Sequence, residues 1–211
     1  VDSGYHHQYM RNTLQLNRGF QADSLPRFSE IGQLAGISNT DWSWTPFFVD
    51  LDNDGYKDIF ITNGYLRDFT NLDFMKYTST VYNEAKVANK PVDYLNLIQQ
   101  LPTTTLRNYV FKNINGIEFR NSTDDWGLTH QSVSNGAVYA DLDNDGDYDL
   151  IINNLNDQIT VLRNNQNEIQ HNNFIKIRLK GKLGNTYGLG AKIMITTDSA
   201  SIFQEAYFTR G

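Results

Sequence analysis

Asp50-Leu-Asp-Asn-Asp-Gly-Tyr-Lys-Asp-Ile59 is one of two nearly identical stretches in this chain, and the other is Asp141-Leu-Asp-Asn-Asp-Gly-Asp-Tyr-Asp-Leu150. Each stretch follows an apolar run and precedes another. Aspartates stand at relative positions 1, 3, 5 and 9 of both copies, and a glycine stands at position 6. The aspartates are Asp50, Asp52, Asp54 and Asp58 in the first copy and Asp141, Asp143, Asp145 and Asp149 in the second. A spacing that is duplicated in this way indicates a functional loop.

The spacing of these carboxylates predicts that each loop binds calcium. Two like charges about 4 Å apart near a protein surface repel by on the order of 4 kcal/mol, so the loop either splays into solvent or closes around a hard cation. Oxygen ligands at this density favour calcium over zinc or copper. Gly55 and Gly146 allow the sharp turn, and the backbone carbonyls of Tyr56 and Asp147 at position 7 would add a further ligand. The sequence therefore predicts two calcium sites.

The flanks of the loops predict strands. An EF-hand loop carries a bidentate glutamate at position 12, whereas the two copies have Ile61 and Ile152 there. Short runs of β-branched and aromatic residues lead into and out of each loop, at residues 45–49 and 59–62 and at residues 137–140 and 150–152. We therefore expect each loop to join the two strands of a β-hairpin.

Two other interpretations compete with calcium binding. The first is a plain turn, because Asp, Asn and Gly are common turn residues. The second is the magnesium-dependent Asp-x-Asp motif of haloacid-dehalogenase-type phosphotransferases, which has Thr or Val four residues after its first aspartate. Asp54 and Asp145 occupy that place here. A single active site would also need only one copy of the motif.

The duplication extends beyond the loops and predicts β-propeller blades. Residues 14–17 and 28–30 precede the first loop much as residues 109–113 and 118–120 precede the second, and Asn115-Gly116 is a hairpin turn signal. A unit therefore contains a strand, a calcium loop, a strand, a connection and a hairpin, which suits a four-stranded blade. We predict an all-β fold with integrin-like blades over residues 1–170, forming a partial propeller because two blades cannot close one.

A helical insertion is predicted at about residues 66–106, where apolar residues recur at steps of three and four. Thr70 and Asp73 resemble a capping box, Pro91 ends the first helix, Asp93 caps a second one, and Pro102 ends it. Such an insertion either offers an interaction surface or covers the edges of the blades.

All three tryptophans fall in expected connections between blades, so we expect them at the end of the blades opposite the calcium loops. They are Trp42, Trp44 and Trp126. Exposed tryptophans are frequent anchors for partners, which makes this end a candidate binding face. The alternative is that these side chains plug the ends of the blades.

A second domain is predicted from residue 171 to residue 211. Phe174-Ile-Lys-Ile-Arg-Leu179 alternates apolar and polar residues as a strand does, and a further apolar run covers residues 188–195. Neither run carries an aspartate loop. We expect the beginning of a β-sandwich-like domain here.

These residues resemble the FG-GAP/VCBS-repeat proteins, in particular the cartilage-acidic-protein-like branch with a C-terminal ASPIC/UnbV domain that is common in Bacteroidetes. The Asp-Leu-Asp-Asn-Asp-Gly-x-x-Asp loops match calcium loops of integrin-like blades. Residues 172–175, Gly184-Asn185, Gly188-x-Gly190 and Thr209-Arg-Gly211 look like parts of ASPIC/UnbV. The resemblance implies an exported, cell-surface or extracellular protein that acts in adhesion, complex assembly or glycan handling, and it implies no known reaction.

Composition narrows the choice of partners. The formal net charge of −6 argues against nucleic acid, and two bound calcium ions would bring it to about −2. No run approaches the roughly 20 apolar residues that cross a bilayer. The absence of cysteine excludes disulfides, thiolate metal sites and a cysteine nucleophile.

The function predicted from the sequence is a calcium-binding extracellular module that binds or scaffolds a protein or a glycan, with calcium in a structural role. One alternative is a carbohydrate-active enzyme that uses carboxylates outside the loops, such as Asp68, Asp73 or Asp125. Another is an accessory subunit of an outer-membrane nutrient-uptake complex that contacts a larger partner through the helical insertion.

Overall fold

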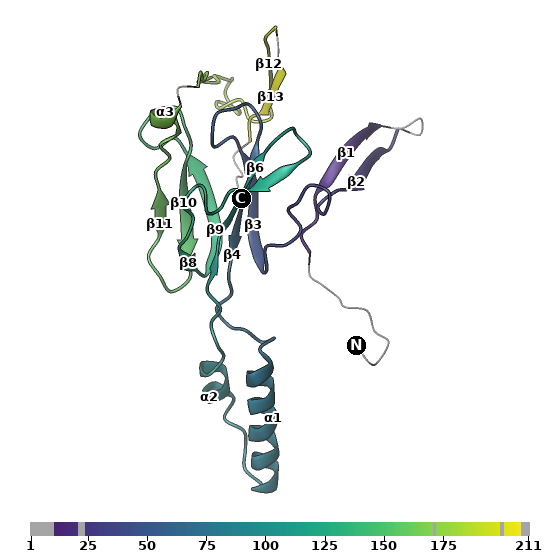
Figure 1. Ribbon diagram of the computed structural model, residues 1–211, viewed down its shortest axis with the longest axis vertical. Helices are drawn as coiled ribbons and strands as arrows, with labels where there is room; N and C mark the ends of the chain where they lie inside the picture. Colours follow the sequence, from purple (N-terminus) through teal and green to yellow (C-terminus); the bar gives the residue numbers. More distant parts are fainter. Residues whose placement is uncertain (1–10, 21–23, 171, 199–200, 208–211) are drawn as a thin grey trace.

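The computed structural model describes residues 11–20, 24–170, 172–198 and 201–207, which form small antiparallel sheets with few helices (Figure 1). The strands are β1 (Gln15–Phe20), β2 (Pro26–Glu30), β3 (Ser43–Val49), β4 (Asp58–Asn63), β5 (Leu106–Arg107), β6 (Tyr109–Asn113), β7 (Phe119–Asn121), β8 (Gln131–Ser132), β9 (Ser134–Ala140), β10 (Asp149–Asn154), β11 (Thr160–Leu162), β12 (Lys192–Thr196) and β13 (Ser201–Glu205). The helices are α1 (Leu72–Val87), α2 (Tyr94–Gln99) and α3 (Gln166–Ile169). A predominantly β chain with a helical insertion is therefore confirmed.

A four-stranded antiparallel sheet in the order β3-β4-β6-β7 forms the middle of the fold. The first aspartate loop joins β3 to β4, with Val49 paired to Asp58. β6 and β7 form a hairpin across Asn115-Gly116, where Gly116 has a φ of 89° that glycine adopts at little cost. Both predicted hairpins are present, and β4 pairs with β6 to join them into one sheet.

The second aspartate loop joins β9 to β10 in the same way, with Ala140 paired to Asp149. β11 adds to the other edge of β10, so this sheet has three strands in the order β11-β10-β9. β1 and β2 form a two-stranded sheet of their own. The predicted position of both loops within hairpins is therefore confirmed.

Apolar clusters pack against both faces of the four-stranded sheet, because successive side chains of a strand point to opposite faces. On one face, Ile59 and Ile61 pack with residues of the segment that follows β2. On the other face, Phe60 packs with residues of β9 and β10. The first cluster contains Ile31, Ala35, Ile37, Ile59, Ile61, Phe111 and Phe119, and the second contains Phe47, Val49, Leu51, Phe60, Val110, Tyr139, Leu150 and Ile152. The middle sheet thus packs between the segment that follows β2 on one face and β9 and β10 on the other.

The duplication is also visible in the backbone of the turns that precede each loop hairpin. Residues 31–37 and residues 122–128 follow β2 and β7 respectively, and each contains a glycine in the left-handed region, with φ of 81° at Gly36 and 78° at Gly127. Their hydrogen bonds correspond: Ala35 donates to Ile31 at 2.7 Å and Trp126 to Ser122 at 2.9 Å, while Ile37 donates to Gly32 at 3.1 Å and Leu128 to Thr123 at 2.9 Å. The repeat is therefore one of structure as well as of sequence.

The helical insertion leaves the sheet after β4, at the end opposite the aspartate loops, and Figure 1 shows α1 and α2 projecting from that end. A bridge between Tyr65 and Thr104 closes its neck. The cap of α1 is Asn71, whose side chain accepts a hydrogen bond from the Phe74 amide at 2.9 Å. The predicted cap at Thr70 is wrong, because the Thr70 hydroxyl donates to Asp68 instead. Asp93 caps α2 as predicted.

The predicted strand at residues 174–179 is not formed. A strand needs a neighbour for its backbone groups, and this segment instead crosses the aspartate loops, where its side chains make the contacts described below. The apolar run that follows contributes β12, which pairs with β13. The described residues form no closed ring of blades, so the propeller stays a prediction, as does the second domain.

Phe47 and Phe48 are neighbours on β3 that point to opposite faces of the sheet. Substituting each in turn tests the packing of the cluster that contains Phe47. Phe47 is 6% exposed and lies 5.2 Å from the ring centroids of both Phe60 and Tyr139, whereas Phe48 is 46% exposed. We expect Phe47→Ala to lower the free energy of unfolding by about 3–5 kcal/mol. Phe48→Ala is the matched control and should lower it by about 1 kcal/mol. Urea unfolding measures both, and equal losses would contradict the packing.

Candidate metal centre

Each aspartate loop is shaped by two residues with positive φ. Asn53 and Gly55 have φ of 55° and 93° in the first loop, and Asn144 and Gly146 have φ of 64° and 97° in the second. Asparagine tolerates this region and glycine adopts it freely, so the loop turns sharply at relative positions 4 and 6. The turn brings carboxylates that are two residues apart in the sequence to the same side of the loop.

Three carboxylates converge in each loop. Asp50, Asp52 and Asp58 each offer an oxygen within 4.8 Å of the others in the first loop. Asp141, Asp143 and Asp145 do the same in the second loop. The structure therefore brings together six of the eight predicted carboxylate ligands in two groups that could hold a metal ion. Asp54 and Asp149 lie outside these groups.

The last aspartate of each loop ties three segments of the chain together. Asp58 accepts hydrogen bonds from the amides of Leu51 at 3.0 Å and Asn113 at 2.9 Å. Asp149 accepts them from the amides of Leu142 at 2.9 Å and Asn164 at 2.8 Å. Both carboxylates are almost fully buried. Their oxygens therefore hold the start of the loop against the neighbouring strand, in addition to any role as ligands.

Within these two groups, two buried carboxylate oxygens have no hydrogen-bond partner. They are Oδ1 of Asp52 and Oδ1 of Asp141. Asp52 is only 7% exposed. Leaving such an oxygen without a donor or a cation is unfavourable by about 1–3 kcal/mol or more for a charged group. These two oxygens are therefore open to a hydrogen-bond donor or a cation.

Basic side chains partly neutralise both loops. The Lys112 ammonium contacts Asp52 and lies 3.1 Å from Oδ2 of Asp54. Arg163 lies 2.9 Å from Oδ2 of Asp143. Lys176 lies 2.8 Å from Oδ2 of Asp141 and lowers the pKa of that carboxyl group through its hydrogen bond. No local pattern in the sequence places these three residues at the loops.

Burial raises the pKa of several loop carboxyl groups. Desolvation, reinforced by neighbouring carboxylates, raises the pKa of Asp50 to about 6 and that of Asp58 to about 7. Hydrogen bonds from backbone amides oppose this shift in both cases. The same desolvation raises the pKa of Asp147. Bringing a divalent cation to such groups would displace protons from them.

Relative position 7 differs between the two loops. Tyr56 is 48% exposed, whereas Asp147 is fully buried. The Asp147 carboxylate accepts a hydrogen bond from the Asn167 amide at 3.1 Å, and Asn167 also donates to the Asp145 carbonyl at 2.7 Å. Asp147 therefore fastens the second loop to α3. Among the described residues, Tyr56 makes no corresponding contact in the first loop.

The two loops contact each other and the segment that follows α3. Asn53 donates to the Gly146 carbonyl at 3.3 Å, and Asn164 donates to the Leu51 carbonyl at 2.7 Å. Asn172 then donates to the Asp52 carbonyl at 2.9 Å. A side chain added at Gly146 would meet the ring of Phe174. The segment 172–176 thus crosses both loops.

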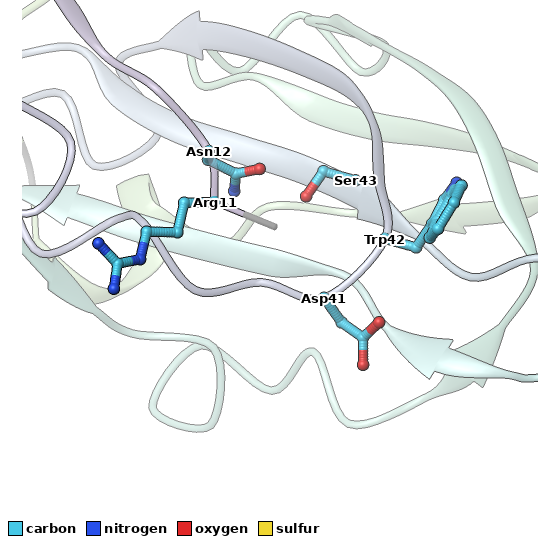
Figure 2. A pocket seen from close by; sticks show the side chains of 5 residues that line it. All are labelled: Arg11, Asn12, Asp41, Trp42 and Ser43. Carbon is cyan, nitrogen blue, oxygen red and sulfur yellow. The ribbon is translucent and has the colours of Figure 1, made fainter. Parts of the chain in front are cut away.

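The tryptophans lie in two different places. Trp42 borders a hollow of about 170 Å³ with Arg11, Asn12, Asp41 and Ser43, and Figure 2 shows these side chains. Trp44, which is 45% exposed, donates a hydrogen bond to the Gly64 carbonyl and so lies at the same end of β3 and β4 as Trp42. Trp126 instead lines a hollow of about 400 Å³ together with Leu51 and Asp52. The expectation that all three tryptophans lie opposite the loops is therefore wrong for Trp126, because the turn after β7 folds back over the buried cluster.

The carboxylates considered for catalysis lie on separate elements. Asp68 is buried in the neck of the insertion, and despite its desolvation its pKa is lowered by hydrogen bonds from Thr70 and Thr104. Asp73 is in the first turn of α1, 3.9 Å from Lys76. Asp125 is exposed in the turn after β7. Their placement gives no carboxylate pair for acid and base catalysis.

Comparison with known proteins identifies no relative: no family model, curated protein or solved structure matches this chain. None of the helices in the described ranges combines the length and the apolar character that crossing a membrane requires. The candidate centre is therefore defined by its own geometry, as two groups of oxygen donors on duplicated hairpins.

In the metal-free protein, we expect the free energy of unfolding to fall as pH rises from about 4 to about 7. Asp50 and Asp58 bind protons with pKa values of about 6 and about 7 in the folded chain but near 3.8 when unfolded. Between these values the folded state holds more protons, so each pH unit lowers stability by at most about 1.4 kcal/mol per group.

Urea unfolding in EDTA at pH 4.5 to 7.5 measures this dependence, with Asp58→Asn as the variant that should flatten it. Asp73→Asn, which alters an exposed carboxylate far from the loops, is the control. A wild-type curve parallel to that of Asp58→Asn would contradict the raised pKa of Asp58.

The two glycines at position 6 form a matched pair for testing the segment over the loops. Each has a φ above 90°, so an alanine at either position loses about 1 kcal/mol or more. At Gly55 an added methyl group meets no atom within 4 Å, whereas at Gly146 it meets Phe174. We expect Gly146→Ala to be the less stable variant in urea and to expose residues 172–180 to limited proteolysis. Equal stability and equal cleavage would contradict the contact.

Proposed function

We propose that this chain is a calcium-binding β-propeller module of the FG-GAP/VCBS type, in which calcium holds the loops of the blades in shape. The observation that carries the proposal is the duplicated hairpin loop with three converging carboxylates, of which one buried oxygen lacks a partner. Calcium takes six to eight oxygen ligands and tolerates irregular geometry. Position 7 carbonyls, the remaining aspartates and water would complete each set.

The choice of calcium rests on the chemistry of the donors. Each group offers carboxylate oxygens and no nitrogen or sulfur ligand, which suits a hard cation rather than zinc or copper. Magnesium demands near-octahedral geometry and dehydrates reluctantly. Loops that bring several carboxylates directly around one point favour the larger ion.

The blade interpretation rests on the way the sheets stack. A propeller blade has a neighbour on each face, and other parts of the chain pack against both faces of β3-β4-β6-β7. The loop hairpins of consecutive units also point the same way, since the two loops contact each other. Further blades would supply the neighbours that the outer sheets lack.

A protein or glycan partner is proposed at the end opposite the loops. α1 has no buried residue, and both of its ends carry exposed apolar side chains. Leu72 is 70% and Val87 is 90% exposed, and Leu95 of α2 is 68% exposed. Trp44 adds an exposed aromatic ring at the base of the insertion. Apolar surface of this kind is typical of interaction sites.

The proposed location is the cell surface or the extracellular space. Extracellular calcium modules bind the ion with dissociation constants of about 10⁻⁴–10⁻³ M, which matches millimolar calcium outside cells. A carbohydrate-active enzyme is less well supported, because Asp68, Asp73 and Asp125 lie on separate elements.

Calcium titration of the metal-free chain tests the proposal. We expect two ions per chain, and at 2 mM calcium an increase in the free energy of unfolding of about 1–2 kcal/mol per site if the dissociation constant is about 0.2 mM. Magnesium at the same concentration should stabilise the chain less. Calorimetry gives the stoichiometry and thermal melting gives the stabilisation.

Single variants assign the ions to the loops. Asp52→Asn and Asp143→Asn should each remove one ion, because each changes a carboxylate of one converging group. Asp73→Asn is the control and should leave two ions bound. A chain that binds no calcium, or that responds equally to magnesium, would overturn the proposed function.

A further inference from the structure

Each aspartate loop faces a basic residue that contacts the same two of its carboxylates. Lys112 contacts Asp52 and lies 3.1 Å from Asp54, at relative positions 3 and 5 of the first loop. Arg163 lies 2.9 Å from Asp143 and 3.9 Å from Asp145, at positions 3 and 5 of the second. The same electrostatic contact therefore occurs in both copies.

Lys112 and Arg163 also occupy equivalent places in the fold. Lys112 precedes Asn113 on β6, and Arg163 precedes Asn164 just after β11. The amides of these asparagines donate to Asp58 and Asp149, the last aspartates of the two loops. The side-chain amides correspond as well, because Asn113 donates to the Lys57 carbonyl at 2.9 Å and Asn164 to the Tyr148 carbonyl at 3.2 Å. The strand next to each loop hairpin thus delivers one positive charge to a fixed point of the loop.

The position of this charge has two electrostatic consequences. Without metal, it offsets the mutual repulsion of the carboxylates at positions 3 and 5, which stabilises the closed loop. With metal, it repels the incoming cation and occupies carboxylate oxygens that could serve as ligands. One residue therefore stabilises the metal-free loop and weakens metal binding.

The two loops differ in how strongly this effect should operate. The Lys112 side chain is 26% exposed, whereas that of Arg163 is 57% exposed. Arg163 also shares its charge with Glu168, at 2.9 Å. Because solvent and salt screen exposed charges more than buried ones, Lys112 should have the larger influence.

We propose that Lys112 and Arg163 are built-in counter-cations of the two loops, which hold the loops closed without metal and lower their affinity for calcium. The effect on calcium affinity rests on the proposed function. The stabilisation of the metal-free loop rests on the ion pairs alone. The two residues thereby set the calcium concentration at which the loops fill.

The experiment compares two chains that both carry Asp143→Asn, so that only the first loop binds calcium. One of them also carries Lys112→Met, and the other is the parent. Removing one positive charge beside a divalent ion should tighten calcium binding about tenfold. Lys112→Arg keeps the charge and should bind as the parent does. Lys76→Met is the matched control for net charge, because Lys76 lies on α1 and pairs only weakly with Asp73, at 3.9 Å.

The metal-free state is measured separately. In EDTA, Lys112→Met should melt at a lower temperature than Lys76→Met, and added salt should lower the melting temperature of the wild-type chain more than that of Lys112→Met. Arg163→Met, tested in an Asp52→Asn background, should tighten binding by about threefold, reflecting its greater exposure. Should Lys112→Met fail to fold, Lys112→Gln is measured in its place, since it keeps a polar side chain without the charge.

The outcomes separate this proposal from the proposed function. Weaker calcium binding by Lys112→Met would overturn the proposal and make Lys112 a residue that orients the ligands. Unchanged affinity and unchanged metal-free stability would overturn it as well. Absence of calcium binding by the unaltered chain would overturn the proposed function, whereas a lower metal-free melting temperature of Lys112→Met would still support the counter-cation role.

Discussion

Asp58 and Asp149 carry the interaction on which the rest of the structure depends. Each buried carboxylate accepts hydrogen bonds from the backbone amide near the start of its own loop and from the amide of an asparagine on or just after the neighbouring strand. Buried carboxylates are tolerated only when hydrogen bonds satisfy them, so these bonds fix the loop, its hairpin and the neighbouring strand in one arrangement. The shape of the candidate metal centre follows from this anchoring.

The anchored hairpins explain how the sheets are organised. Because each loop closes one end of a hairpin, the insertion that follows β4 must leave from the other end. The chain therefore separates two kinds of surface in space, with the charged loops at one end and helices with exposed apolar side chains at the other (Figure 1). The two apolar clusters pack against opposite faces of the four-stranded sheet between these ends.

The loops balance repulsion with local compensation. Burial raises the pKa of Asp50 and Asp58, and repulsion between the neighbouring carboxylates adds to this shift. Lys112, Arg163 and Lys176 offset part of this charge. A divalent cation would compensate the remainder more completely, which links the proposed calcium sites to the stability of the loop hairpins.

The sequence by itself determined the loops, their hairpins, the Asn115-Gly116 turn and the helical insertion, because these features depend on local spacing and turn chemistry. Asp52, Asp141 and their neighbours could be predicted as ligands for the same reason. Only the tertiary structure decided that Lys112, Arg163 and Lys176 meet the loops and that Trp126 lines the same hollow as Asp52. It also decided that residues 174–179 form no strand, although they alternate as one. Such contacts join distant parts of the chain, so the packing of whole sheets determines them rather than any local pattern.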